Sequence, residues 1–229
     1  MIELINPILN FVELGGPVVA VLLFLSLGAV LLIGIKAITF FIRGVGKHGN
    51  ATKAVALWKK RNRPKAMNRL RGTKSALEKT LLVSMERINR GKMYKEDIED
   101  EVASVAIREL HELQRGLRTL EAIAQIAPLL GLFGTVLGMI DAFQKLQSAG
   151  NSVDPSILAG GIWVALLTTA AGLAVAMPVS LVLTWFETRV EDERVAIQTM
   201  NADLINKHMT FEQKPLDAEQ GEPGGAYAH

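Results

Sequence analysis

Residues 155–186 read PSILAGGIWVALLTTAAGLAVAMPVSLVLTWF and contain no Asp, Glu, Lys or Arg. A helix needs about 20 mostly apolar residues to cross the hydrocarbon core of a bilayer. This segment exceeds that length, so we expect it to tilt or to project beyond the bilayer. The segment therefore indicates a transmembrane helix.

Two other segments, residues 14–35 and 122–140, also lack these four residue types. We predict an all-α membrane protein with transmembrane helices over residues 14–41, 119–146 and 155–186. Three buried helices of a large soluble core are the weaker interpretation, because such helices seldom run this long without a charge. A cleaved signal peptide does not fit the first segment, since residues 1–16 include Glu3 and Glu13 but no basic residue.

The distribution of basic residues predicts the orientation of the chain. Nineteen of the 25 Lys and Arg residues lie between positions 43 and 118, whereas residues 1–13 and 147–154 have none. Basic loops remain in the cytoplasm. We therefore expect a periplasmic leader over residues 1–13, a cytoplasmic loop over residues 42–118, a periplasmic turn over residues 147–154 and a cytoplasmic C-terminus.

The cytoplasmic parts are predicted to be helical. Within the loop, Pro64 should begin a new helix and Gly91 should end one. Apolar residues from Ile98 to Leu120 recur mostly at three- and four-residue steps, so we expect this helix to continue without interruption into the second span. The third span should extend over residues 187–212 and form a helical bundle with the loop. Residues 213–229, rich in Gly, Pro, Glu and Gln, are predicted to be disordered.

Composition narrows the possible functions. The net charge of +2 gives no indication of a nucleic-acid partner, and the absence of cysteine excludes disulfides and thiolate chemistry. The histidines, including His48 and His111, lack metal-ligand spacing and are expected to be solvated. The acidic residues after Lys95 are expected to begin a helix rather than to bind a cation. Membrane lipids are expected to surround the spans, and neither a cofactor nor a metal is predicted.

The predicted spans contain hydroxyl and amide groups but no carboxylate or histidine at membrane depth. Proton carriers usually place a titrating group there, so any such group would have to come from a partner or from water. The polar residues of interest are Thr135, Thr168 and Thr169. Two interpretations remain open for them, since a threonine in a membrane helix can bond a carbonyl one turn back or can line a wet path.

Small residues recur along the second and third spans, where they allow helices to approach closely. They can serve packing of these two spans on each other, or they can face a channel or a partner helix. Pro128 and Pro178 are expected to kink their helices. The small residues concerned are Gly131, Gly134, Gly138, Gly161, Ala165, Gly172 and Ala176.

Two sequence motifs resemble a known family. Residues 127–143, APLLGLFGTVLGMIDAF, resemble the second-span signature of the MotA/TolQ/ExbB proton-channel family, and residues 159–178, AGGIWVALLTTAAGLAVAMP, are similar to its third span. The three-span plan resembles ExbB and TolQ more than MotA. The resemblance implies a ring-shaped homo-oligomer, a pentamer, in the inner membrane of a Gram-negative bacterium.

The resemblance also implies a function and partners. The ring would surround helices of an ExbD- or TolR-like single-span protein that carries an intramembrane Asp, and proton flow would drive a TonB- or TolA-like protein. The two pore threonines of the family match Thr135 and Thr169, and Thr168 is a secondary candidate. Many members carry Glu in a third-span pattern IAEAL, whereas this chain has IWVAL with Val164 at that position.

Three hypotheses follow from the sequence. The first is a proton-driven subunit of ExbB/TolQ type. The second is a membrane scaffold that organises partners without conducting ions, which the absent carboxylates and Val164 motivate. The third, a membrane enzyme, has little support because the sequence contains no recognisable base or metal motif.

Overall fold

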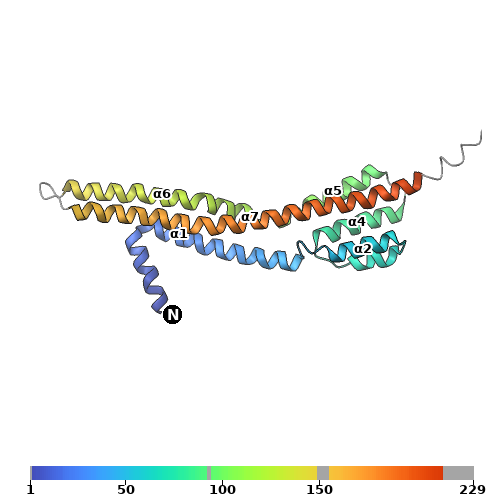
Figure 1. Ribbon diagram of the computed structural model, residues 1–229, viewed down its shortest axis with the longest axis horizontal. Helices are drawn as coiled ribbons and strands as arrows, with labels where there is room; N and C mark the ends of the chain where they lie inside the picture. Colours follow the sequence, from blue (N-terminus) through green and yellow to red (C-terminus); the bar gives the residue numbers. More distant parts are fainter. Residues whose placement is uncertain (1, 92–93, 149–154, 214–229) are drawn as a thin grey trace, which may run out of the picture. The chain divides into compact units, whose positions relative to one another are not determined.

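A computed structural model describes residues 2–91, 94–148 and 155–213. All regular structure in these residues is helical, which agrees with the predicted fold class (Figure 1). The helices are α1 (Ile2–Arg43), α2 (Gly49–Lys59), α3 (Arg63–Leu70), α4 (Ala76–Arg90), α5 (Lys95–Gln114), α6 (Leu117–Ser148) and α7 (Pro155–Gln213). Most of the predicted turn over residues 147–154, and all of the predicted tail except Gln213, lies outside the described residues.

Three of these helices are long and apolar enough to cross a membrane. The candidate spans are Gly16–Arg43, Leu117–Ser148 and Leu158–Lys207. They overlap the three segments predicted from the sequence, so the prediction of three long apolar helices is confirmed. The first span begins at Gly16, whose φ of 66° interrupts α1 and suits a residue without a Cβ atom.

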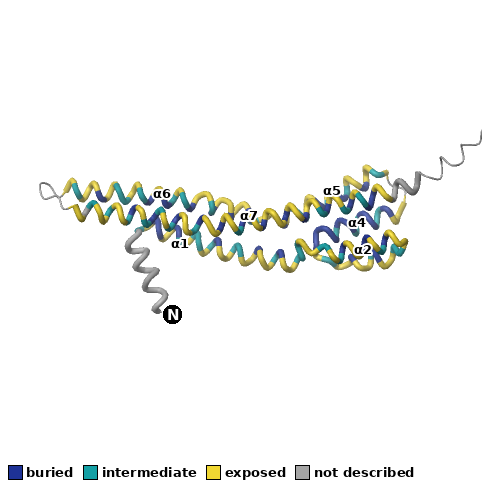
Figure 2. The backbone as a smooth tube through the Cα atoms, viewed as in Figure 1, coloured by how far each residue is buried: buried dark blue, intermediate teal, exposed yellow. Residues whose placement is uncertain are grey.

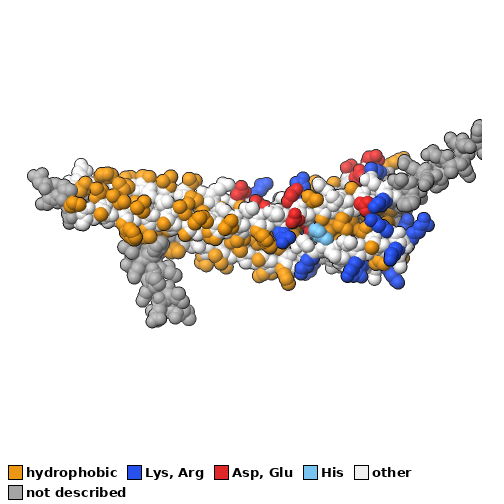
Figure 3. Space-filling view, in the orientation of Figure 1, with side chains coloured by type: hydrophobic (Ala, Val, Ile, Leu, Met, Phe, Trp, Pro, Cys, Tyr) orange, Lys and Arg blue, Asp and Glu red, His pale blue; other side chains and the backbone are white. Residues whose placement is uncertain are grey.

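The chain divides into two compact units, and the first contains α1 up to Thr39 together with Arg115–Glu187. Its centre is a small apolar cluster in which Val18 and Leu22 of α1 meet Ala127 of α6 and Ala176 of α7. Many larger apolar side chains of this unit point outward, and Phe24 is 76% exposed (Figures 2 and 3). A soluble surface rarely carries so large an apolar area, so these faces suit lipid or other membrane helices.

The second unit contains Phe40–Gln114 and the part of α7 from Thr188 onward. Its core is fully buried, with Leu77, Leu81 and Met85 of α4 among the enclosed side chains. Asn201 of α7 is buried as well, and it accepts a 2.6 Å hydrogen bond from Ser84 and donates a 3.1 Å bond to Thr80. The part of α7 beyond residue 187 is therefore an integral helix of this bundle.

Local signals in the second unit correspond to the predicted boundaries. Pro64 lies in the first turn of α3, where the missing N–H group is harmless. Gly91 ends α4 with a φ of 64°, and Glu96 and Asp97 lie in the first turn of α5. The predicted helix breaks at Pro64 and Gly91 and the predicted acidic helix start are therefore confirmed.

The prediction of one continuous helix from Ile98 into the second span is wrong. α5 ends at Gln114 and α6 begins at Leu117, because Gly116 adopts a φ of 84° that no α-helical residue has. The apolar spacing continues across this interruption, with Leu113 and Leu117 both buried. The periodicity therefore concealed the break.

We expect Gly116→Ala to destabilise the protein by about 1 kcal/mol, because the left-handed conformation is unfavourable for a residue with a Cβ atom. The added methyl group would also lie 3.3 Å from the Lys36 side chain. The measurement is the midpoint of detergent-induced unfolding followed by circular dichroism. Gly28→Ala is the control, because its site in α1 has open space and an ordinary helical φ, and an equal loss of stability in both variants would contradict the prediction.

Candidate functional site

The candidate site lies in the first unit, where α6 and α7 run side by side (Figure 1). Glycines of one helix face backbone or small side chains of the other. A methyl group built on Gly172 would lie 2.6 Å from the carbonyl oxygen of Ala127, and one on Gly131 would lie 3.0 Å from that of Thr168. Neither contact leaves room for a side chain, so the two backbones approach as closely as their atoms allow.

The other small residues named above also lie along this contact. A methyl group on Gly134 would lie 2.6 Å from the Thr168 hydroxyl oxygen, and one on Gly138 would lie 3.2 Å from the Ala165 Cβ atom. One on Gly161 would overlap the Cβ atom of Ala142. Ala176 is buried in the apolar cluster described above. Of the two interpretations of the small-residue stripe, this geometry favours packing of the two spans on each other.

The three candidate threonines are placed differently. Thr168 is 1% exposed, and its hydroxyl lies 2.7 Å from the Ala165 carbonyl oxygen and 3.2 Å from that of Gly131. Thr169 is half-buried and donates to the same Gly131 oxygen at 3.2 Å. Thr135, also half-buried, donates to the Leu132 carbonyl at 2.6 Å. All three hydroxyl protons therefore go to backbone carbonyls. Thr135 and Thr168 reach a carbonyl one turn back, as the first interpretation of these threonines expects, whereas Thr169 donates across to α6.

The Gly131 carbonyl is the point where these groups converge. In an α-helix it accepts the N–H group of Thr135, four residues later. It is also within hydrogen-bonding distance of the hydroxyls of Thr168 and Thr169. A hydroxyl that donates to a carbonyl retains lone pairs that can accept from water. Thr135 and Thr169 could use them because both are partly exposed, whereas Thr168 is enclosed.

Val164, at the position of the family Glu, is half-buried on α7 between the exposed Trp163 and the buried Ala165. It supplies no charge to this region. Pro128 and Pro178 lie inside α6 and α7, which continue through them. Among the described residues, no group of three or more Asp, Glu and His side chains is placed to hold a metal ion.

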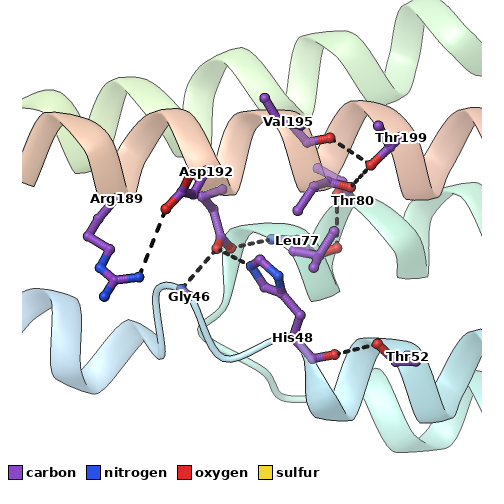
Figure 4. A network of polar contacts seen from close by, with 11 residues as sticks. Gly46, His48, Thr52, Leu77, Thr80, Arg189, Asp192, Val195 and Thr199 are labelled. Atoms are coloured by element: carbon purple, nitrogen blue, oxygen red, sulfur yellow. Dashed lines mark hydrogen bonds and ion pairs between the residues drawn. The ribbon is translucent and has the colours of Figure 1, made fainter.

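A polar cluster that sequence reasoning missed lies in the second unit (Figure 4). Glu193 of α7 is 1% exposed, and its carboxylate accepts a 3.2 Å bond from the Gly46 N–H and a 3.3 Å bond from the Leu77 N–H. The His48 ring lies 3.0 Å from the same carboxylate through its Nε2 atom. His48, expected to be solvated, is therefore only partly so, with 32% of its side chain exposed and its ring on Glu193, whereas His111 is exposed as expected.

The cluster stabilises a buried carboxylate by several favourable contacts. Leu77 belongs to the first turn of α4, so Glu193 also lies at the positive end of that helix dipole. The Glu193 cluster, formed by Glu193, His48, Gly46 and Leu77, thus joins the loop after α1, the start of α4 and the extension of α7.

The fold and site define a helical multi-pass membrane protein with a close-packed, hydroxyl-bearing pair of spans. Residues 70–199 match the profile of the MotA/TolQ/ExbB proton channel family, which is more than half of the chain. The chain belongs to this family.

Individual relatives support the assignment. The chain is 40% identical over 108 residues to a putative biopolymer transport protein ExbB homolog of Methanothermobacter thermautotrophicus, which is 47% of this chain and 38% of the relative. It is 42% identical over 86 residues to biopolymer transport protein exbB1 of Vibrio cholerae, covering 37% of this chain and 38% of the relative. It is 33% identical over 104 residues to the Tol-Pal system protein TolQ of Haemophilus influenzae, covering 45% of this chain and 43% of the relative. The matched region thus spans less than half of each of these relatives.

Proposed function

We propose that this chain is a subunit of an inner-membrane proton channel of ExbB/TolQ type, which couples the proton motive force to a TonB- or TolA-like partner. The observation that carries the proposal is the pair of partly exposed hydroxyls, Thr135 and Thr169, on the two spans that match the family. Their oxygens can accept from water while their protons are donated to the helix backbone. Such a surface can line a wet path across a membrane.

The uncharged segments of the second and third spans contain no carboxylate or histidine, so a partner must supply the group that carries the proton. Residues 122–140 and 155–186 contain no Asp, Glu or His. An ExbD- or TolR-like single-span protein with an intramembrane Asp meets this need. The exposed apolar faces of α1, α6 and α7 support assembly of several copies around that partner, and a pentameric ring is the arrangement we propose.

The proposed orientation follows from the basic residues. The second unit carries most of the Lys and Arg side chains, as Figure 3 illustrates, and basic segments stay in the cytoplasm. The N-terminus and the turn after α6 would then lie in the periplasm. The periplasmic leader, cytoplasmic loop and cytoplasmic extension keep the boundaries predicted from the sequence.

We expect Thr135→Val and Thr169→Val to lower partner-dependent proton flux more than tenfold in liposomes, which corresponds to about 1.4 kcal/mol in the barrier. Valine keeps the shape of threonine but removes the oxygen that accepts from water. Thr184→Val, on the same helix as Thr169, is the matched control and should conduct normally, because its hydroxyl donates to the Ser180 carbonyl outside the α6–α7 contact. Unchanged flux in the double variant would contradict the pore assignment.

Thr168→Val separates a packing role from a pore role. Because Thr168 is enclosed, its replacement should lower stability but leave the flux per folded complex within about twofold of normal.

A second candidate function is a scaffold that organises partners without conducting ions. Val164 at the Glu position and the enclosed Thr168 hydroxyl favour it. The two functions differ in one measurement, which is proton flux through liposomes that contain the chain and its partner. Flux that disappears when the partner's intramembrane Asp is replaced by Asn removes the scaffold, and the absence of flux from the intact assembly removes the channel.

A further inference from the structure

A pocket of about 450 Å³ lies in the second unit, where α1 ends and where α2 and α4 begin. Ile42 and Arg43 line it from α1, Lys53 lines it from α2, and Glu78 lines it from α4. Five basic side chains contribute to the lining, against a single acidic one. The basic residues are Arg43, Lys47, Lys53, Arg69 and Lys74.

Three of the five cations already have contacts within this unit. Arg43 lies 3.5 Å from a carboxylate oxygen of Glu109, and the Arg69 Nε donates a 2.8 Å hydrogen bond to Asn50. Lys47 lies 4.8 Å from the centre of the Phe41 ring. The neutral partners Asn50 and Phe41 hold Arg69 and Lys47 at the pocket wall without cancelling their charge, whereas Arg43 is paired with a carboxylate.

The other two cations, Lys53 and Lys74, are exposed, and no carboxylate in the described part of the chain forms an ion pair with either. Lys53 extends from α2, whereas Lys74 belongs to the loop before α4. Glu78, the one acidic residue of the lining, is 8% exposed, and Arg43 already pairs with two carboxylates outside the lining, so four cations face one carboxylate. The pocket therefore has a surplus of positive charge that a multivalent anion could use.

Uncapped backbone groups add to this charge. The first residues of α2, Gly49 and Asn50, line the pocket, and the residue before them caps the helix with no side-chain hydrogen bond. The first N–H groups of a helix have no partner inside it and attract anions. With the lysines and arginines, they form an open basic depression suited to a phosphate group.

The position of the pocket along α1 indicates where its ligand comes from. Ile42, in the pocket lining, and Phe41 beside it are 54% and 76% exposed, and both belong to the candidate span Gly16–Arg43. The pocket thus lies beside Arg43, the last residue of the candidate span, and we take this end of the span to be at the level of the lipid headgroups. A ligand bound there can contact both the basic residues of the pocket and the apolar surface at the end of α1.

We propose that this basic pocket binds the phosphate group of an anionic phospholipid from the adjacent leaflet. Basic pockets at the ends of membrane helices suit such headgroups, and the exposed Ile42 and Phe41 can contact the first part of an acyl chain. The proposal depends on the span and the pocket alone and is independent of ion conduction.

The test uses the full chain in a neutral detergent and measures binding of dioctanoyl phosphatidylglycerol by isothermal titration calorimetry. We expect the double variant Lys53→Gln/Lys74→Gln to bind the lipid about tenfold more weakly, because each basic residue near an anionic surface contributes roughly a factor of five and salt screens part of it. Lys60→Gln/Lys65→Gln is the matched control. It removes the same charge from exposed sites outside the pocket and should leave the affinity within about twofold.

Two further arms identify the ligand. Binding of dioctanoyl phosphatidylcholine, which has no net charge, tests whether the ligand must be anionic. Binding of inorganic phosphate tests whether the ligand must be a lipid. The proposal holds if phosphatidylglycerol binds at least tenfold more tightly than both and only the pocket variant weakens it. If the control variant loses as much affinity for phosphatidylglycerol as the pocket variant, the binding is general electrostatic attraction. If inorganic phosphate binds as tightly as phosphatidylglycerol, the pocket is a site for soluble anions. If phosphatidylglycerol does not bind to the unmodified chain, the pocket has no lipid ligand. Each of these three results overturns the proposal.

Discussion

Replacing Gly172 with valine should separate α6 from α7 and lower the free energy of unfolding by about 3 kcal/mol, the upper part of the range for overpacking in a core. The reason is that the first added carbon would lie 2.6 Å from the Ala127 carbonyl oxygen and 3.1 Å from the Gly131 Cα atom. Both neighbours are backbone atoms, which cannot rotate away as a side-chain end can. The measurement is the midpoint of SDS-induced unfolding of the purified protein, followed by circular dichroism.

Gly160→Val is the control for this experiment. Gly160 lies on the same helix, and a Cβ atom there has no atom within 4 Å. Its replacement should change the unfolding midpoint little. If both variants lose the same stability, the loss reflects the general cost of valine in this helix, and the proposed contact between Gly172 and α6 is contradicted.

Replacing Glu193 with alanine should have the second large effect, a loss of about 3 kcal/mol in the stability of the second unit. The change leaves the buried Leu77 N–H group without an acceptor, which costs about 1–3 kcal/mol, and it also removes the acceptor of the partly exposed Gly46 N–H group and empties a buried side-chain site. Amide hydrogen exchange measures the effect residue by residue. The amides of Gly46 and Leu77 should exchange about 100-fold faster, as a loss of about 3 kcal/mol implies.

Glu191→Ala, two residues earlier on the same helix, is the matched control. Glu191 is exposed and lies 3.7 Å from Arg194 in a surface ion pair, which contributes about 0–1 kcal/mol. Its replacement should leave the exchange of both amides unchanged. Slow exchange of Gly46 and Leu77 in Glu193→Ala would mean that another group satisfies these donors and that the Glu193 cluster does not join the three segments.

The sequence predicted the parts of the fold that depend on local patterns. The three spans follow from long apolar segments, and the ends of α3 and α4 follow from Pro64 and Gly91, whose backbone preferences act locally. The break at Gly116 was missed because the apolar spacing on both sides of it stays in phase. A glycine alone does not say whether its φ is positive.

The sequence indicated which residues belong to the candidate site, but it did not indicate which of them are buried and which are partly exposed. Thr168 and Thr169 are adjacent and both bond to Gly131 of α6, and the rotation of α7 decides which of the two is enclosed and which stays partly exposed. That rotation follows from contacts such as Gly134 with Thr168, which one sequence does not specify. The family resemblance indicated Thr169 for the pore, and the enclosed position of Thr168 is compatible with that choice.

The Glu193 cluster was missed because His48 and Glu193 are 145 residues apart in the sequence. A local signal was nevertheless present. Glu193 lies between Val190 and Ile197 at three- and four-residue steps, so it falls on the apolar face of the helix. A carboxylate on such a face is rarely buried without partners, and this observation alone could have prompted a search for donors.

The close approach of α6 and α7 has a consequence for how the sequence can vary. At Gly131 and Gly172 the nearest atoms of the other helix belong to the main chain, and at Gly134 they belong to the Thr168 side chain. Any side chain added at these three glycines enlarges the contact. These sites should therefore tolerate almost no replacement. In saturation mutagenesis, we expect nearly every variant of Gly131, Gly134 or Gly172 to be depleted from the selected population, with alanine the least harmful. A Gly134 variant could be rescued by a smaller residue at Thr168, whereas Gly131 and Gly172 face backbone atoms that no substitution removes, so suppressor selection should recover only the first.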